Sequence, residues 1–174
     1  MVDTVLFANK TNDWRTPADI LEIVDATMGG IDLDPCAPSD DPYHTGAETA
    51  FTPQENGLVR DWFGYVYMNP PYGREVPVWI TKAITEVNEG RARCVIAMLA
   101  ARTDTRWFRP LLKYPTAYLH GRVKFIDQDG EPGGEPAFPS ALVMIRKTWS
   151  ADDLDDFARA VGDRGTVVIP WGAI

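Results

Sequence analysis

Four residues that could act on an amino group, Asn69, Pro70, Pro71 and Tyr72, directly follow a run of aromatic and aliphatic residues, 65–68. The run has the composition of a buried strand, and the prolines must end it because proline has no N–H to give to a sheet. Exocyclic amino groups of nucleobases are weak nucleophiles, since the nitrogen lone pair is delocalised into the ring. The Asn69 side-chain oxygen and the Pro70 carbonyl could each accept one N–H of such a group and turn its lone pair toward an electrophilic methyl.

Further properties of this tetrapeptide favour the same chemistry. The fixed φ of proline holds both acceptors still at low entropic cost. The ring of Tyr72 offers a flat face on which an extruded base would stack, worth roughly 1–3 kcal/mol. Ligands of open α/β sheets bind at the carboxyl ends of strands, where Asn69 stands. We therefore predict that all four residues are catalytic, although a surface turn that merely ends a strand would show the same letters.

Two carboxylates, Asp32 and Asp34, lie in another short strand pattern, "IDLDP", which ends at Pro35. The chain has neither a G-x-x-x-x-G-K-[ST] loop nor a G-x-G-x-x-G turn, the patterns that present backbone N–H groups to phosphates. ATP and NAD are therefore poor candidate ligands. A cofactor without phosphate, with hydroxyls and amines to recognise, would instead need carboxylates at a strand end. Either aspartate alone could equally cap a turn.

The elements that must position these residues alternate between strand and helix. A helix is predicted at 15–30, with Thr16 as N-cap, Pro17 at the first position and a glycine stop. A second helix is predicted at 76–90, with an apolar face of Val78, Ile80, Ile84 and Val87, and a third, short helix at 105–112. A buried strand is predicted at 93–100. This alternation implies parallel βαβ units, with the polar stretch 36–58 as a long functional loop.

The C-terminal third has a different pattern. Segments 121–127 and 138–146 flank a Gly/Pro-rich turn and predict an antiparallel hairpin, followed by an acidic helix from Ser150 and a strand at 166–170. The chain has 174 residues, of which 45% are hydrophobic. We therefore expect one domain over 1–174 with no separate target-recognition domain. Two cysteines and no apolar run of about 18 residues predict no metal site, no membrane span and a cytoplasmic location.

The charge distribution is uneven. The net charge is −8, but window 91–124 holds eight basic residues and one acid, which makes it +7 and leaves −15 for the rest. Segregation of this kind can create one positive face on an acidic protein, although scattered surface charges are the alternative. Nucleic acid is therefore a candidate partner despite the acidic total.

The chain also resembles a known family. An "NPPY" element after a strand is the signature of S-adenosylmethionine-dependent amino-methyltransferases. The ordered pattern "DWRTPADIL", "GGIDLDPCA", "ENGL", "YMNPPYG", "MLAARTDTRWF", "GRVKF" and "FPSALV", from Trp14 to Ile145, resembles the phage-type DNA N6-adenine methyltransferase (Dam) family. The resemblance implies a Rossmann-like α/β methyltransferase sheet, S-adenosylmethionine as donor and adenine in double-stranded DNA as acceptor, in the host cytoplasm for a phage enzyme.

By position, the resemblance also implies site residues. Thr16 and Pro17 match its "TP" element beside the cofactor, together with Trp14, and Asp34-Pro35 match an acidic-Pro element. The glycine-rich turn of the larger superfamily is replaced here by "DPCAPSDD", so Asp32 and Asp34 are the candidates for the cofactor's ammonium or ribose hydroxyls. Phe51 and Asn56 are the candidates for its adenine. The predicted DNA-binding residues, which come from two basic loops, are Arg102, Arg106, Arg122 and Lys124.

Two alternatives remain open from the sequence. The same acceptors would suit cytosine N4, an RNA base or a protein glutamine amide. A DNA-binding module that keeps the fold without turnover is the alternative from another class.

Overall fold

The computed structural model describes residues 14–133 and 136–171. Seven strands form one sheet: β1 (Leu33–Asp34), β2 (Thr49–Ala50), β3 (Gly64–Met68), β4 (Ala92–Ala100), β5 (Thr116–Leu119), β6 (Ser140–Ile145) and β7 (Gly165–Val168). Three α-helices accompany it: α1 (Ala18–Met28), α2 (Val76–Asn88) and α3 (Ala151–Val161). Short 3₁₀ turns are η1 (Gly57–Val59), η2 (Arg109–Leu111) and η3 (Gly162–Arg164). The expected α/β class is confirmed.

The sheet is parallel in its first half and mixed in its second. The strand order is β2-β1-β3-β4-β6-β5-β7, and β1 to β4 pair in parallel. Strand β6 is antiparallel to both β4 and β5, and β7 is antiparallel to β5. Strand β5 therefore runs in the direction of β1 to β4, so the carboxyl ends of these five strands meet at one edge.

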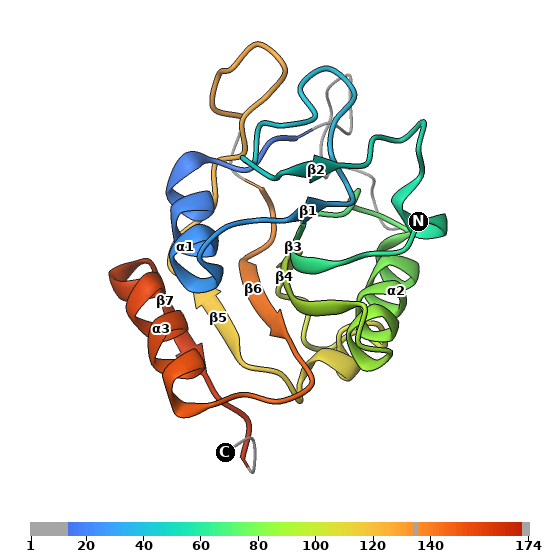
Figure 1. The fold of residues 1–174 in the computed structure, drawn as a ribbon. Coiled ribbons are helices and arrows are strands. Elements are labelled where there is room, and N and C mark those ends of the chain that lie inside the picture. The colour runs from blue at the N-terminus through green and yellow to red at the C-terminus, as the bar shows by residue number, and fades with distance from the viewer. Residues whose placement is uncertain (1–13, 134–135, 172–174) are drawn as a thin grey trace.

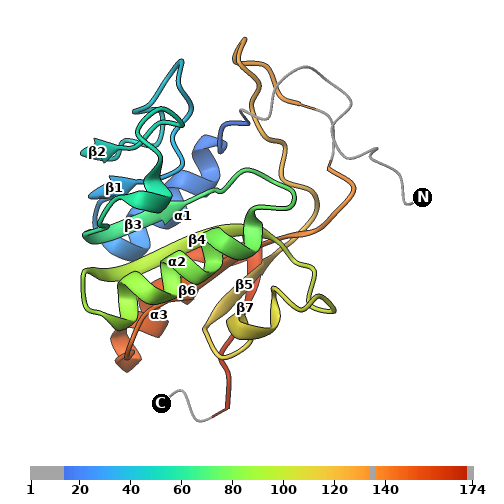
Figure 2. The ribbon, with the colours of Figure 1, turned by 90° about the vertical axis from the view of Figure 1, so that its right-hand side faces the viewer.

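Helices cover both faces of the sheet (Figure 1). Successive residues of β4 point to opposite faces, as the pleat requires. Ile96 and Met98 pack with α1 and α3, while Val95 and Leu99 pack with α2. Figure 2 shows α2 lying across its face of the sheet, with the short helical turn η2 below it. A strand buried on both faces reads as a continuous apolar run, so the strand prediction for this segment is confirmed.

Helix ends follow the sequence signals in part. Gly29 ends α1 with φ 73°, as predicted, and the predicted acidic helix α3 starts with a reciprocal capping box of Ser150 and Asp153. The prediction of Thr16 as the N-cap is wrong, because Pro17 occupies that position and the Thr16 hydroxyl bonds elsewhere. The predicted face of α2 is also wrong in one member, since Val78 is 53% exposed while Trp79 is buried.

The predicted C-terminal hairpin is wrong. Segment 138–146 contains β6, whose partners are β4 and β5. Residues 121–127 form no strand, although Ile126 exchanges two backbone hydrogen bonds of 2.9 Å with Arg15. The alternation in 121–127 reflects real burial of Val123 and Phe125, but Ile126 bridges Arg15 before α1 and Pro132 after a local turn, and the segment does not pair with 138–146.

Two smaller elements also differ from the sequence predictions. Segment 105–112 contains turns and the three-residue η2 in place of a helix, with Pro110 inside it. Strand β2 lies within the stretch predicted as loop and pairs with β1 through only two residues. Elements this short carry too little periodicity to be found from sequence.

Candidate active site

Asn69 directly follows β3, and the neighbouring strand β1 ends at Asp34 on the same edge. A cavity with about 510 Å³ of empty space, partly open to solvent, lies there and is called the Asn69 cavity. Its lining residues are Trp14, Asp34, Cys36, Ala37, Pro38, His44, Pro53, Tyr67, Asn69, Pro70, Pro71 and Tyr72. The structure thus brings the whole predicted tetrapeptide together with Asp34 and Trp14.

The side-chain amide of Asn69 is held in one orientation. Its nitrogen donates to the backbone oxygen of Trp14 over 3.4 Å and to the hydroxyl of Thr16 over 3.3 Å. Its oxygen Oδ1 is buried and has no hydrogen-bond partner among the residues that the structure describes. A buried acceptor without a donor is costly, and such atoms occur where a ligand supplies the missing donor.

Thr16 connects this amide to the sheet. Its hydroxyl lies 2.6 Å from that of Tyr67, the residue two positions before Asn69, and both residues are buried. If the Thr16 hydroxyl donates to Tyr67, its oxygen remains free to accept from Asn69. Thr16 therefore acts on Asn69 through its hydroxyl, while Pro17 caps α1 and lines neither of the cavities described here.

The ring of Tyr72 lies in an aromatic cluster. It meets Phe138 at a centroid distance of 5.1 Å with the planes tilted by 31°, and Phe125 edge-on at 5.8 Å. The guanidinium of Arg102 lies over the ring of Phe138, 5.9 Å from its centroid. Burial raises the pKa of the Tyr72 phenol well above its usual value, so it stays protonated. Tyr72 thus offers ring surface and a neutral hydroxyl rather than a base.

Asp34 is the buried carboxylate of the Asn69 cavity. It accepts from the Cys36 backbone N–H over 2.9 Å and from the Thr45 hydroxyl over 3.3 Å. Burial raises its pKa to about 7, against the lowering effect of these two hydrogen bonds. A cation or a pair of hydroxyls beside it would stabilise its charged form.

Asp32 has a different environment. Its carboxylate accepts from the backbone N–H of Tyr65 over 2.6 Å and lines neither cavity. Gly64 adopts φ +61° beside it, with no room for a Cβ next to this carboxylate. Asp32 therefore joins β1 to β3 before the strands reach the site.

A second cavity, called the Phe51 cavity, adjoins the first and has about 600 Å³ of empty space, which includes solvent at its open side. Its lining residues are Pro35, Cys36, Ala37, Phe51, Thr52, Pro53, Asn56, Gly57, Leu58, Pro71, Glu75 and Trp79. Cys36, Ala37, Pro53 and Pro71 line both cavities. Three predicted cofactor residues, Pro35, Phe51 and Asn56, thus meet here and are continuous with Asp34.

Several lining residues were not singled out from the sequence. His44 belongs to the Asn69 cavity, and burial lowers its pKa, so the ring is neutral near pH 7. Burial also raises the pKa of the Cys36 thiol, which disfavours a reactive thiolate. Their only sequence signal was their place in the long polar stretch 36–58. No group of three or more metal-ligating side chains occurs among residues 14–133 and 136–171.

The basic window divides between two edges of the sheet. Arg102 and Arg106 follow β4, and Arg122 and Lys124 follow β5, so all four exposed side chains come from the edge that carries Asn69. Arg91 and Arg93 lie at the opposite end of β4, where Arg91 pairs with acidic side chains. The window therefore does not form one continuous face.

Comparison with known proteins supports the same reading as the geometry. The family model described as DNA N-6-adenine-methyltransferase (Dam) matches residues 4–163. The chain belongs to this family. The Dam family is defined by an enzyme activity, and the match spans both cavities and the "NPPY" element, so the family resemblance noted from the sequence is confirmed.

Two curated relatives from phages carry the name DNA N-6-adenine-methyltransferase. The protein of Haemophilus phage HP1 is 28% identical over 138 residues, which cover 76% of this chain and 77% of the relative. The protein of Escherichia phage T1 is 28% identical over 98 residues, or 55% of this chain and 38% of the longer relative. In the part of the Dam-family chain that the structure describes, no helix is long and apolar enough to cross a bilayer.

Proposed function

We propose that this chain transfers a methyl group from S-adenosylmethionine to the N6 amino group of adenine in DNA. The observation that carries the proposal is the orientation of Asn69. Its side-chain nitrogen donates to the Trp14 carbonyl and to the Thr16 hydroxyl. Its buried oxygen, in the cavity that Pro70 and Tyr72 also line, has no hydrogen-bond donor among the described residues. Family membership and the names of the phage relatives support adenine in DNA as the acceptor.

The adjoining cavities have the chemical character that S-adenosylmethionine requires. The Phe51 cavity combines the apolar residues Phe51, Leu58 and Trp79 with a few polar residues, which suits a flat adenine ring. Asp34, between this cavity and Asn69, suits the ribose hydroxyls or the ammonium group. Trp14 and Thr16 stand beside the predicted methionine end. We do not assign Asp32 to the cofactor, because its carboxylate is engaged by Tyr65.

When bound, S-adenosylmethionine supplies an electrophilic methyl group on sulfur. Asn69 Oδ1 and the Pro70 carbonyl accept the two N–H bonds of the target amino group and localise its lone pair. Pro71 fixes the backbone that carries them, and Tyr72 stacks against the extruded base. As the amino nitrogen bonds to the methyl carbon, the methyl–sulfur bond would break to leave S-adenosylhomocysteine, and the nitrogen would release one proton to water.

The basic residues at the same edge support double-stranded DNA as the partner. The guanidinium of Arg102 lies over Phe138, whose ring packs against Tyr72. Arg122 and Lys124 lie in the segment that pairs with Arg15, beside the Asn69 cavity. We propose that these loops and Arg106 hold the phosphates. The strand order, with an antiparallel strand inserted before the last parallel one, supports a Rossmann-like methyltransferase sheet. The phage relatives support a phage-encoded enzyme acting inside the host cell.

The direct test incubates the protein with labelled S-adenosylmethionine and unmodified double-stranded DNA, followed by mass analysis of the nucleosides. The expected product is N6-methyl-2′-deoxyadenosine in the DNA digest. Label on cytosine N4, on RNA or on a protein amide would refute the assigned acceptor. DNA binding without any transfer would refute catalysis.

A further inference from the structure

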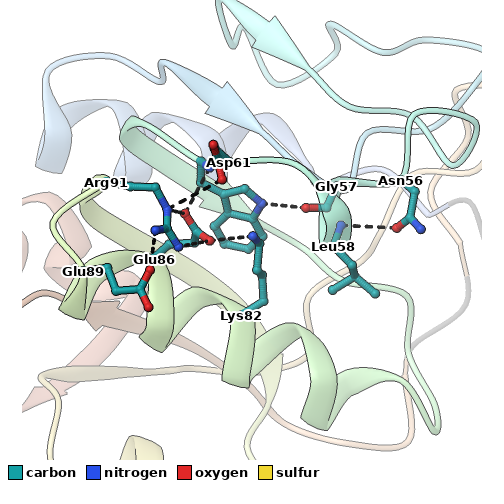
Figure 3. Close-up of polar contacts among 9 residues, drawn as sticks. Asn56, Gly57, Leu58, Asp61, Lys82, Glu86, Glu89 and Arg91 are labelled. Carbon is teal, nitrogen blue, oxygen red and sulfur yellow. Dashed lines mark hydrogen bonds and ion pairs between the residues drawn. The ribbon is translucent and has the colours of Figure 1, made fainter.

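A buried anion lies behind the wall of the Phe51 cavity. Glu86, on α2, is 0% exposed, which is rare for a glutamate unless its charge is compensated. Its oxygens accept from Lys82 Nζ at 2.5 Å and from Arg91 Nε and Nη2 at 2.6 and 2.8 Å (Figure 3). Although burial raises its pKa, these donors and a backbone N–H lower it to about 2, so the group is ionised.

That backbone N–H belongs to Trp62. It donates to Glu86 Oε2 over 3.1 Å, and Trp62 itself is 1% exposed. The indole Nε1 of Trp62 in turn donates to the backbone oxygen of Gly57 over 2.8 Å. One carboxylate on α2 therefore fixes Trp62 by its backbone, and Trp62 fixes Gly57 by its side chain.

Gly57 and its neighbours are part of the cavity wall. Asn56, Gly57 and Leu58 all line the Phe51 cavity. Gly57 packs so closely on Pro35 that a Cβ would overlap the Pro35 carbonyl oxygen. Asn56 adopts φ 54°, unusual for a residue with a side chain, and its oxygen accepts from the Leu58 N–H over 3.2 Å. Such a backbone persists when its surroundings hold it.

A second contact runs from the same tryptophan to the cavity. The ring of Trp62 stacks on that of Trp79, with centroids 6.3 Å apart and planes at 29°. Trp79 lines the Phe51 cavity from α2. Glu86 and Trp62 do not themselves line either cavity. The hydrogen bond to Gly57 and the ring contact with Trp79 connect Trp62 to the cavity wall.

We propose that Glu86 is a positioning residue, which sets the affinity of the Phe51 cavity for the adenosine half of S-adenosylmethionine by holding Trp62 and, through it, Gly57. This inference rests on the proposed function, since it takes that cavity as the cofactor site. Because the cavity wall is already ordered before the ligand binds, the free energy of binding does not include the entropic cost of ordering the wall. Because the network stays clear of Asn69, its loss should weaken binding without changing the transfer step.

The test uses two variants in the full chain. Trp62→Phe removes the indole N–H and keeps a ring, and Glu86→Gln removes the charge. Calorimetric titration with S-adenosylhomocysteine should show Kd raised about threefold to tenfold in each, the range that one lost hydrogen bond gives. The KM for S-adenosylmethionine should rise by a similar factor while kcat stays at the wild-type value.

Glu89→Gln is the matched control. Glu89 pairs with the same Arg91 but is 54% exposed and has no contact with Trp62 among the interactions described. Its Kd should equal that of the wild type. Because this titration needs no DNA, it reports on the wall even if the wild type fails to methylate adenine, which would count against the proposed function alone.

The outcomes separate positioning from general stability. Partial misfolding lowers the number of binding sites per chain and the melting temperature but leaves the Kd of the folded fraction unchanged. Such a result, or a Kd for Trp62→Phe equal to that of Glu89→Gln, would overturn the inference. If Glu86→Gln does not fold, the Kd of Trp62→Phe decides, since that variant keeps the buried charge paired.

Discussion

The side-chain nitrogen of Asn69 donates to the hydroxyl of Thr16, 53 positions earlier in the chain, over 3.3 Å. This bond decides which end of the amide is left for a ligand. With nitrogen turned toward Thr16 and the Trp14 carbonyl, the oxygen is the atom available to an amino group. Thr16 thereby links the start of α1 to the proposed catalytic amide after β3.

Thr16→Val should lower kcat by about tenfold while leaving the Kd for S-adenosylhomocysteine within about twofold of wild type. Valine keeps the shape but removes the acceptor that orients Asn69, and one such hydrogen bond contributes roughly 0.5–1.5 kcal/mol. Thr16→Ser, which keeps the hydroxyl, should restore most of kcat. Equal activity of the valine and serine variants would show that the hydroxyl does not orient the amide. Single-turnover methylation assays make the comparison.

Asn69→Ala should reduce kcat by about 10²–10³, the cost seen when one preorganised transition-state hydrogen bond is removed. Cofactor binding should be nearly unchanged, because Asn69 touches the target amino group. Calorimetry and methylation of DNA measure the two quantities separately. Activity within a few-fold of wild type would remove Asn69 from the mechanism.

Tyr72→Phe should be mild and Tyr72→Ala severe, since the ring rather than the hydroxyl stacks on the base. For the alanine variant we expect kcat/KM for DNA to fall about tenfold to 100-fold, from roughly 1–3 kcal/mol of lost stacking. Its melting temperature should also fall, because Phe125 and Phe138 lose their partner. A phenylalanine variant less active than the alanine variant would instead implicate the hydroxyl.

Asp34 should make cofactor binding depend on pH. Its pKa in the folded protein is about 7, against an ordinary 3.8, so below about pH 7 it must lose a proton before it can accept from ammonium or hydroxyl groups. Affinity for S-adenosylhomocysteine should therefore rise with pH, by about tenfold per unit at most, and level off above 7. The Asp34→Asn variant should bind weakly and lose this dependence. Calorimetry at several pH values checks both.

The raised pKa of Asp34 has the opposite effect on the stability of the cofactor-free protein, which should fall as the pH rises. Between pH 3.8 and about 7 the folded state holds a proton at Asp34 that the unfolded state releases. The contribution of Asp34 to the free energy of unfolding is therefore full below 3.8 and is lost as the pH rises through 7. Thermal melts of wild type and Asp34→Asn across this range should differ in slope. Parallel curves would mean that Asp34 is already ionised.

Arg106→Ala should flatten the salt dependence of DNA binding. Each neutralised phosphate adds about −0.9 to the slope of log affinity against log salt on duplex DNA, so losing one contact should reduce the slope by about one unit for all sequences alike. Arg93→Ala is the matched control, because Arg93 is exposed at the other end of β4. Equal slopes for both variants would place the DNA elsewhere. Fluorescence anisotropy over a salt series gives the slopes.

The sequence by itself determined the local features of this protein. The "NPPY" tetrapeptide ended a strand, 93–100 formed a doubly buried strand, Gly29 stopped α1 and Ser150 capped α3. Each depends on residues within a few positions of one another, through proline geometry, apolar runs or capping hydrogen bonds. The family resemblance rested on the same local motifs taken in order.

Tertiary structure alone decided how distant segments meet. Segment 121–127 pairs with Arg15, not with 138–146, because β6 finds two longer partners in β4 and β5. Asp32 and Asp34 looked alike in "IDLDP", yet one binds the Tyr65 N–H and the other lines the Asn69 cavity. Residues two positions apart share a side of a strand, so only the placement of Tyr65 on β3 separates Asp32 from Asp34. Glu86 likewise became a candidate for function only once Trp62 and Arg91 surrounded it.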